Sequence, residues 1–130
     1  MGGEIPATPA GINMPSPDCI FCRIATGDIP AQIVGRSDHA VAFRDLSPQA
    51  PTHVLVIPTT HLASAAEANG PEGAQLLGEV MALAVRVAAE LGLAEAGYRF
   101  VMNTGREGGQ TVHHLHLHVL GGRQMRWPPG

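Results

Sequence analysis

Three histidines alternate with apolar residues near the end of the chain, at His114, His116 and His118. Side chains on a β-strand point alternately to its two faces, so the three imidazoles would share one face of a strand. The apolar residues between them would share the other face; these are Leu115, Leu117 and Val119. An ordinary solvated face would mix Thr, Glu and Arg instead. Because imidazole acts as nucleophile, acid, base or metal ligand near neutral pH, the row indicates a histidine nucleophile or a three-histidine metal site.

A glycine-rich loop over residues 104–110 leads directly into this row. Gly105, Gly108 and Gly109 would allow backbone N–H groups to turn toward an anion and let the anion approach closely. Asn103 and Thr111 flank the loop with neutral hydrogen-bonding side chains. We therefore expect a phosphate to be held beside an imidazole.

The composition narrows the possible functions. The chain has 130 residues, enough for one domain, and a formal net charge of −3, which argues against a nucleic-acid-binding surface. It contains no lysine, which excludes Schiff-base chemistry and a P-loop lysine. No apolar run is long enough to span a bilayer and no secretory signal is visible, so we expect no membrane partner and a cytoplasmic location.

The elements that must position these residues follow from local patterns. We expect a flexible N-terminal extension over 1–17 and one domain over 18–130. Within the domain, Asp18 would cap a short helix that Gly27 ends. The expected elements are helices over 19–26 and 71–91 and strands over 32–36, 40–44, 53–57, 98–103 and 111–120. Several strands with one long helix predict an α+β fold with a mainly antiparallel sheet.

The long helix shows a single apolar stripe that would face the core. Its cap would be Asn69 or Gly70, with Pro71 in the first turn and Gly92 after the last. The stripe consists of Leu76, Leu77, Val80, Met81, Ala84, Val87, Ala88 and Leu91. Outside the row, we expect His113 to be a partly buried structural residue and His39 to be solvated in a turn.

The segment His114-Leu-His-Leu-His118, followed by Val119-Leu120, resembles the H-x-H-x-H motif of the histidine triad (HIT) superfamily. The resemblance covers residues 18–130, including the segments 43–53 and 108–112 and the Trp-Pro-Pro-Gly ending, and is to the nucleotide-binding branch. It implies a HIT-like fold: a five-stranded, mainly antiparallel sheet with one long helix and a short N-terminal helix.

The resemblance also implies an activity: hydrolysis of purine nucleoside 5′-phosphoramidates through a covalent nucleotidyl-histidine, releasing AMP or GMP, with no cofactor required. His116 would be the nucleophile and His118 would hydrogen-bond the phosphate. His114 would fix the orientation and tautomer of His116. His53 would relay a proton to the leaving amine.

For the nucleotide itself, the resemblance implies contacts along most of the chain. Asp45 would accept both ribose hydroxyls; a turn residue before Ser-Pro is the less favoured interpretation. The base would lie against Ile29, Phe43 and Leu46, which by sequence alone are equally good core residues. The remaining contacts would come from Asn103, Gly109, Gln110 and Thr111, together with His116, His118 and the tail residue Trp127. In this family the tail reaches the partner's site, so a homodimer is implied.

Cys19 and Cys22 are separated by two residues, which leaves three interpretations open. Two thiolates alone do not complete a tetrahedral zinc site, but the resemblance to zinc-bearing bacterial members would add His61 and His114. The pair could also be semi-buried thiols in a helix, or a redox pair. A structural disulfide is not expected without a secretory signal.

Three alternative functions remain open at this stage. The same nucleophile could hydrolyse dinucleoside polyphosphates. The chain could be a nucleotide-binding regulatory protein whose catalysis is incidental. The histidine row could hold a catalytic metal.

Overall fold

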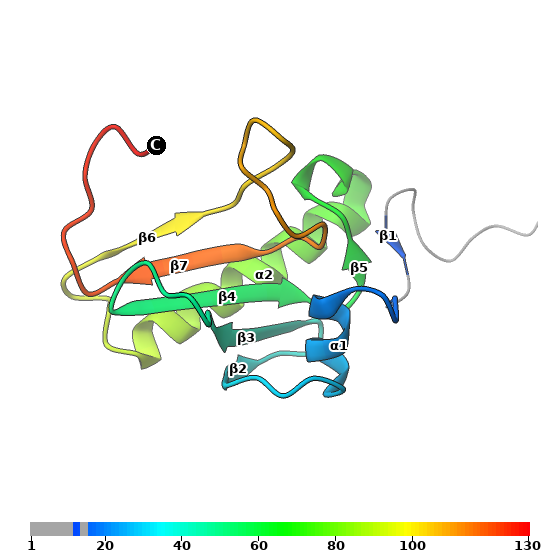
Figure 1. Ribbon diagram of the computed structural model, residues 1–130, viewed down its shortest axis with the longest axis horizontal. Helices are drawn as coiled ribbons and strands as arrows, with labels where there is room; N and C mark the ends of the chain where they lie inside the picture. The colour runs from blue at the N-terminus through cyan, green and yellow to red at the C-terminus, as the bar shows by residue number, and fades with distance from the viewer. Residues whose placement is uncertain (1–11, 14–15) are drawn as a thin grey trace, which may run out of the picture.

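The computed structural model describes residues 12–13 and 16–130 (Figure 1). Its centre is a five-stranded sheet with the order β2-β3-β4-β7-β6, in which every neighbouring pair is antiparallel. The strands are β2 (Ile33–Arg36), β3 (Ala40–Arg44), β4 (Thr52–Pro58), β6 (Tyr98–Val101) and β7 (Leu117–Gly121). The expected α+β fold with an antiparallel five-stranded sheet is confirmed.

The long helix α2 (Gly70–Glu90) covers one face of the sheet. Asn69 is its N-cap, and Gly92 follows it with φ of 80°, a left-handed value that suits glycine. The expected stripe is wrong at Met81, which is 44% exposed, and misses Leu83, which is 2% exposed. Leu83 lies three residues after Val80 and four before Val87, so it shares their face, whereas Met81 is rotated about 100° from Val80.

The short helix α1 (Ile20–Thr26) lies on the opposite face of the sheet. Phe21 and Ile24 pack there against apolar side chains of β3 and β4. The helix begins differently from expectation, because Cys19 and not Asp18 is the N-cap: the Cys22 amide donates to the Cys19 sulfur at 3.4 Å. Gly27 ends the helix as predicted, with φ of 88°.

The predicted strand over 111–120 is wrong in its first half. β7 begins only at Leu117, and four consecutive side chains, His114 to Leu117, are buried. Residues 112–116 form bends and irregular backbone in place of the expected strand. The amide of Leu115 donates to the carbonyl of Leu62, in β5 (His61–Leu62).

Two residues of the expected extension form a strand. β1 (Ile12–Asn13) pairs antiparallel with β5, while residues 1–11 and 14–15 lie outside the described part of the chain. A single 3₁₀ turn (Ala65–Glu67) connects β5 toward α2. Among the described helices, none has the length and apolar character needed to cross a membrane.

We predict opposite effects of two alanine substitutions in α2. A Cβ atom on Gly73 would lie 2.3 Å from the carbonyl carbon of Ala68, whereas a Cβ on Gly78 would meet nothing within 4 Å. Gly73→Ala should lower the free energy of unfolding by about 1–3 kcal/mol, because backbone must move. Gly78→Ala should raise it by up to about 1 kcal/mol. Urea unfolding measures both, and destabilisation by Gly78→Ala would contradict the helix geometry.

Candidate active site

Three histidines gather on the face of the sheet that carries α1. His53 lies on β4 and His118 on β7, opposite Leu55, while His116 lies just before β7. His53 and His116 are only 5% and 6% exposed. The rings of His116 and His118 are 5.0 Å apart, and those of His53 and His118 are 5.1 Å apart. The expected shared face is thus observed for His116 and His118, and β4 adds His53.

The tautomer of His116 follows from its backbone contact. Its Nδ1 lies 2.8 Å from the carbonyl oxygen of His114. A carbonyl only accepts hydrogen bonds, so Nδ1 carries the hydrogen and the neutral ring keeps its lone pair on Nε2. Phe21 packs edge-on against this ring at 5.2 Å and fixes its plane. The arrangement presents Nε2 as a nucleophile or a base.

The His114 side chain does not take part in this contact, although its carbonyl does. Its ring is fully buried and turned away, with Nε2 2.9 Å from the Pro58 carbonyl. The orienting role expected of His114 therefore has a structural basis in its backbone and not in its imidazole.

His53 and His118 form a hydrogen-bonded pair with a defined direction. The amide of Gln49 donates to His53 Nδ1 at 3.0 Å, so the neutral His53 ring carries its hydrogen on Nε2. His53 Nε2 lies 2.9 Å from His118 Nδ1, which therefore accepts, and His118 carries its own hydrogen on Nε2. Asp45 Oδ2 lies 3.5 Å from His53 Nε2. Each ring is thereby left with one assigned N–H donor.

Three carboxylate and imidazole ligand atoms, from Asp45, His53 and His118, lie within 4.8 Å of one another. This spacing alone would suit a metal ion. The Gln49 contact opposes it, because His53 Nε2 carries a hydrogen and has no lone pair to offer. The hydrogen-bond pattern therefore does not favour a metal ion at these three residues.

Burial keeps the two paired histidines neutral. Burial lowers the pKa of His53, against the opposing effect of the Asp45 carboxylate. Burial, followed by the neighbouring imidazoles of His116 and His53, lowers the pKa of His118 to about 4. Near pH 7 both rings are therefore uncharged, as the tautomer assignment requires.

An apolar pocket of about 260 Å³ lies on the same face of the sheet, between α1, the end of β3 and Leu55 in the middle of β4. It brings together Ile29, Phe43, Asp45 and Leu46, the four residues expected to contact base and ribose. Sequence reasoning missed eight further lining residues, which are Arg44 and the apolar residues Ile20, Phe21, Ile24, Pro30, Ala31, Leu55 and Val112. Their apolar spacing was visible, but it does not distinguish a core contact from a pocket wall. Asp45 also caps its own loop, since its Oδ1 accepts from the Ser47 amide at 2.7 Å.

The glycine-rich loop is not the open cradle of amides that we expected. The amide of Gly105 donates to Gln110 Oε1, that of Gln110 donates to the Gly105 carbonyl, and that of Gly109 donates to the Arg106 carbonyl. The Gln110 side chain also donates to the carbonyls of Ala63 and Val112, at 2.7 and 3.0 Å. These amides, and the side chain of Gln110, therefore stabilise the loop and are not free to hold a phosphate.

The other expected contacts lie outside the apolar pocket. Asn103 is half-buried just beyond β6, Thr111 is exposed, and Trp127 is 83% exposed. His39 is exposed as predicted, but His113 is exposed too, so its expected burial is wrong. The alternation on which that expectation rested applies only from Leu117 onward.

Cys19, Cys22, His61 and His114 form a second cluster, with all four ligand atoms within 4.8 Å of one another. His114 Nδ1 lies 3.3 Å from the Cys19 sulfur and 3.4 Å from the Cys22 sulfur, and His61 Nδ1 lies 3.3 Å from the Cys22 sulfur. Because His114 Nε2 donates to Pro58, its Nδ1 lone pair points at the thiols. Burial raises the pKa of Cys22. Two sulfurs and two nitrogens at this spacing fit a tetrahedral zinc ion.

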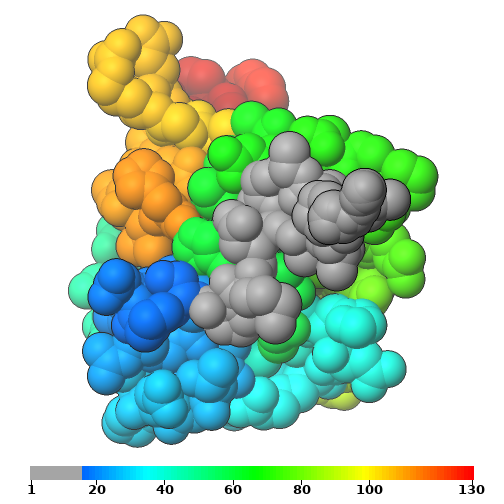
Figure 2. Space-filling model, turned by 90° about the vertical axis from the view of Figure 1, so that its right-hand side faces the viewer, coloured from blue at the N-terminus to red at the C-terminus, as the bar shows by residue number. Residues whose placement is uncertain are grey.

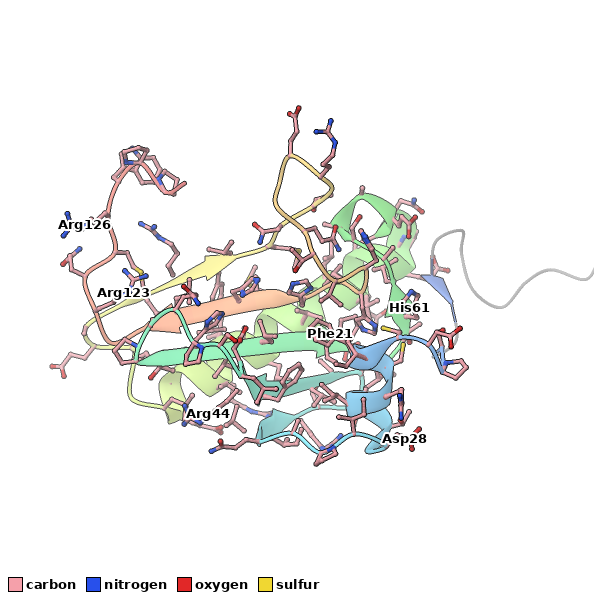
Figure 3. The ribbon with its side chains drawn as sticks, in the orientation of Figure 1. Phe21, Asp28, Arg44, His61, Arg123 and Arg126 are labelled. Atoms are coloured by element: carbon pink, nitrogen blue, oxygen red, sulfur yellow. The ribbon has the colours of Figure 1, made fainter. Side chains whose placement is uncertain are left out.

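Figure 2 shows this end of the molecule, where the start of α1 lies next to the segment that precedes β7. In Figure 3, His61 is seen close to α1, at the same end of the sheet. A surface pocket of about 470 Å³ opens here, lined by residues that include Cys19, His61, Thr111 and His113. The cluster is therefore reached from a different pocket than the apolar one.

A five-stranded antiparallel sheet, with one long helix on one face and buried paired histidines on the other, defines an α+β protein of the HIT-like fold. Residues 26–125 match the HIT domain family, and the chain belongs to this family.

Relatives and solved structures agree with this family assignment. The chain is 52% identical over 115 residues to an uncharacterised HIT-like protein of Synechococcus elongatus, covering 88% of this chain and 99% of the relative. It is 45% identical over 108 residues to the purine nucleoside phosphoramidase of Escherichia coli, covering 83% of this chain and 90% of the relative. The structure of a HIT family hydrolase from Legionella pneumophila superposes on this chain with a TM-score of 0.83 at 49% identity. The superposition covers 87% of this chain and 100% of the hydrolase.

We predict that His118 makes the stability of the protein depend on pH. The unfolded chain binds a proton on this histidine near its ordinary pKa of 6.5, whereas the folded protein binds it only near 4. As pH falls through this window, the unfolded state takes up more protons and stability is lost. His118→Asn retains an acceptor near the position of Nδ1, but its side chain does not titrate. Between pH 7 and pH 4.5 the free energy of unfolding, measured by urea titration, should therefore fall less in this variant than in the wild type. Equal losses in the two proteins would contradict the assignment.

Proposed function

We propose that this protein hydrolyses purine nucleoside 5′-phosphoramidates, with His116 as the nucleophile. The observation that carries the proposal is the hydrogen bond from His116 Nδ1 to the His114 carbonyl, because it leaves a lone pair on Nε2. The identity with the Escherichia coli purine nucleoside phosphoramidase supports the substrate class. The apolar pocket with Asp45 at its edge supports a nucleoside as the bound group.

In the first step His116 Nε2 attacks the α-phosphorus and the P–N bond breaks. The leaving nitrogen departs with the bonding electron pair and takes up a proton that the His53–His118 pair has first accepted from solvent, so that the pair is neutral again after the step. His118 Nε2–H faces outward from that pair and stabilises the charge that develops on the phosphate oxygens. The product of this step is a nucleotidyl-histidine and a free amine.

In the second step water attacks the same phosphorus and the bond between phosphorus and His116 Nε2 breaks. The water proton passes through the histidine pair to solvent, and AMP or GMP leaves. No charge is gained or lost by the protein over the two steps. The neutral state of His53 and His118 near pH 7 supports this exchange, because a ring that is permanently protonated could not take the water proton back.

We further propose that Cys19, Cys22, His61 and His114 hold a structural zinc ion. When bound, zinc would link α1, β5 and the segment before β7, which supplies His116. We also propose that the protein is a homodimer. The exposure of the large apolar side chains Met81, Val85 and Trp127 supports a partner surface.

We predict that the wild-type protein releases AMP from adenosine 5′-phosphoramidate and that His116→Ala lowers the rate by about 10³-fold or more, as expected for loss of a nucleophile. His39→Ala is the matched control, because His39 is exposed in a turn, and it should retain the wild-type rate. AMP release is followed by chromatography. Retention of activity by His116→Ala would refute the nucleophile, and an inert wild type that still binds AMP would favour a binding protein.

We predict that protein produced with added zinc carries about one zinc ion per chain and that Cys22→Ser carries almost none. The midpoint of thermal unfolding should fall in Cys22→Ser, because the ion binds only the folded state. His113→Ala, from the same surface pocket, should retain both zinc and stability. Metal analysis and calorimetry give the two readouts. A wild type free of zinc under these conditions would refute the site.

A further inference from the structure

The C-terminal tail is tied to the histidine pair through a single peptide group. Arg123, two residues after β7, donates from Nε to the carbonyl of Gln49 at 3.1 Å. The amide of the same residue, Gln49, donates to His53 Nδ1 at 3.0 Å. Figure 3 shows Arg123 on the tail, at the end of the sheet where β7 stops. Gln49 is thus held by the tail through its carbonyl and holds His53 through its amide.

The Gln49 amide decides which nitrogen of His53 carries the hydrogen. While it donates to Nδ1, the neutral ring must carry its hydrogen on Nε2 and donate to His118, 2.9 Å away. If Gln49 shifted, the hydrogen could move to Nδ1 and the pair would lose its direction. His53 is only 5% exposed, so water is poorly placed to replace the amide.

The loop that carries Gln49 depends on outside support. It spans residues 45–51 between β3 and β4 and contains Pro48 and Pro51, which have no amide hydrogen to donate. Its internal contacts link Ser47 to Asp45 and the Gln49 side chain to the Ser47 carbonyl. The tail packs directly on it as well: a Cβ on Gly122 would lie 2.8 Å from Cβ of Pro51.

We propose that Arg123 is a positioning residue for proton transfer to the leaving group. By holding the Gln49 carbonyl, it keeps the Gln49 amide on His53 Nδ1 and so keeps the tautomer of His53 that donates toward His118. This inference rests on the proposed phosphoramidase function. It assigns to the tail of the same chain a role in catalysis that needs no contact between Arg123 and the substrate.

The test compares two leaving groups in single-turnover measurements of nucleotidyl transfer. An alkylamine must be protonated as it leaves, whereas 4-nitrophenolate leaves without a proton. Arg123→Ala should slow transfer from an adenosine 5′-alkylphosphoramidate by about tenfold, because misdirected proton delivery removes part of the 10²–10⁴-fold effect of general acid catalysis. Transfer from adenosine 5′-(4-nitrophenyl phosphate) should change by less than about twofold.

Arg126→Ala is the matched control. It removes the same charge from the same tail, and the exposed Arg126 contributes its carbonyl, which accepts from Arg99 and remains after the substitution. It should behave as wild type with both substrates. Equal losses with both leaving groups in Arg123→Ala would show a merely structural role. Unchanged rates with both, or the same selective loss in Arg126→Ala, would also overturn the proposal.

A spectroscopic measurement separates this inference from the function on which it rests. Long-range ¹H–¹⁵N correlation spectra of the histidine rings should show an unprotonated Nδ1 on His53 in the wild type and a mixture of tautomers in Arg123→Ala. An inert wild type would refute the phosphoramidase function, and these spectra would then still decide whether Arg123 fixes the tautomer. An unchanged His53 spectrum in Arg123→Ala would refute the inference.

Discussion

The contact between His116 Nδ1 and the His114 carbonyl, at 2.8 Å, constrains most of the surrounding structure. In a regular antiparallel strand a carbonyl points to a neighbouring strand and not to a side chain two residues later. The chain before β7 must therefore leave the sheet, and other groups must hold it. Leu62 accepts from the Leu115 amide, Pro58 accepts from the His114 ring, and Cys19 and Cys22 lie against the same ring. The position of β5 and α1 is thus part of the geometry of His116, the proposed nucleophile.

Burial and backbone contacts act together on the protonation of this site. A buried imidazole is destabilised in its charged form, and here neighbouring rings add to the effect, so the pKa of His118 falls to about 4. A neutral ring has two tautomers, which burial alone does not separate. Backbone groups make the choice: a carbonyl for His116 and an amide for His53. The hydrogen positions of His116 and His53 are consequently fixed before any substrate arrives, and burial keeps the rings of His53 and His118 neutral near pH 7.

The sequence predicts the elements better than the contacts between them. The hairpin strand over 40–44 and the caps at Asn69 and Gly27 depend on local patterns, and the structure has them at those residues. The irregular stretch before β7 was missed, because histidine and apolar residues continue to alternate there although the backbone is no longer a regular strand. The amides of the glycine loop were also misjudged, because glycine permits many conformations and Gln110 selects one through distant carbonyls. From the residues alone, nothing pairs Cys22 with His61; that pairing came from the family resemblance.

The short loop between β3 and β4 contributes both to the apolar pocket and to the histidine pair. Asp45, at its start, lies at the edge of the apolar pocket, and Gln49, near its end, sets the tautomer of His53. The base of the loop is closed by the Asp45 amide, which donates to the His53 carbonyl at 3.0 Å. Asp45 Oδ2 also lies 3.5 Å from His53 Nε2. A displacement of this loop would therefore move the proposed ribose contact and the histidine pair together, because the same loop supports the apolar pocket and His53.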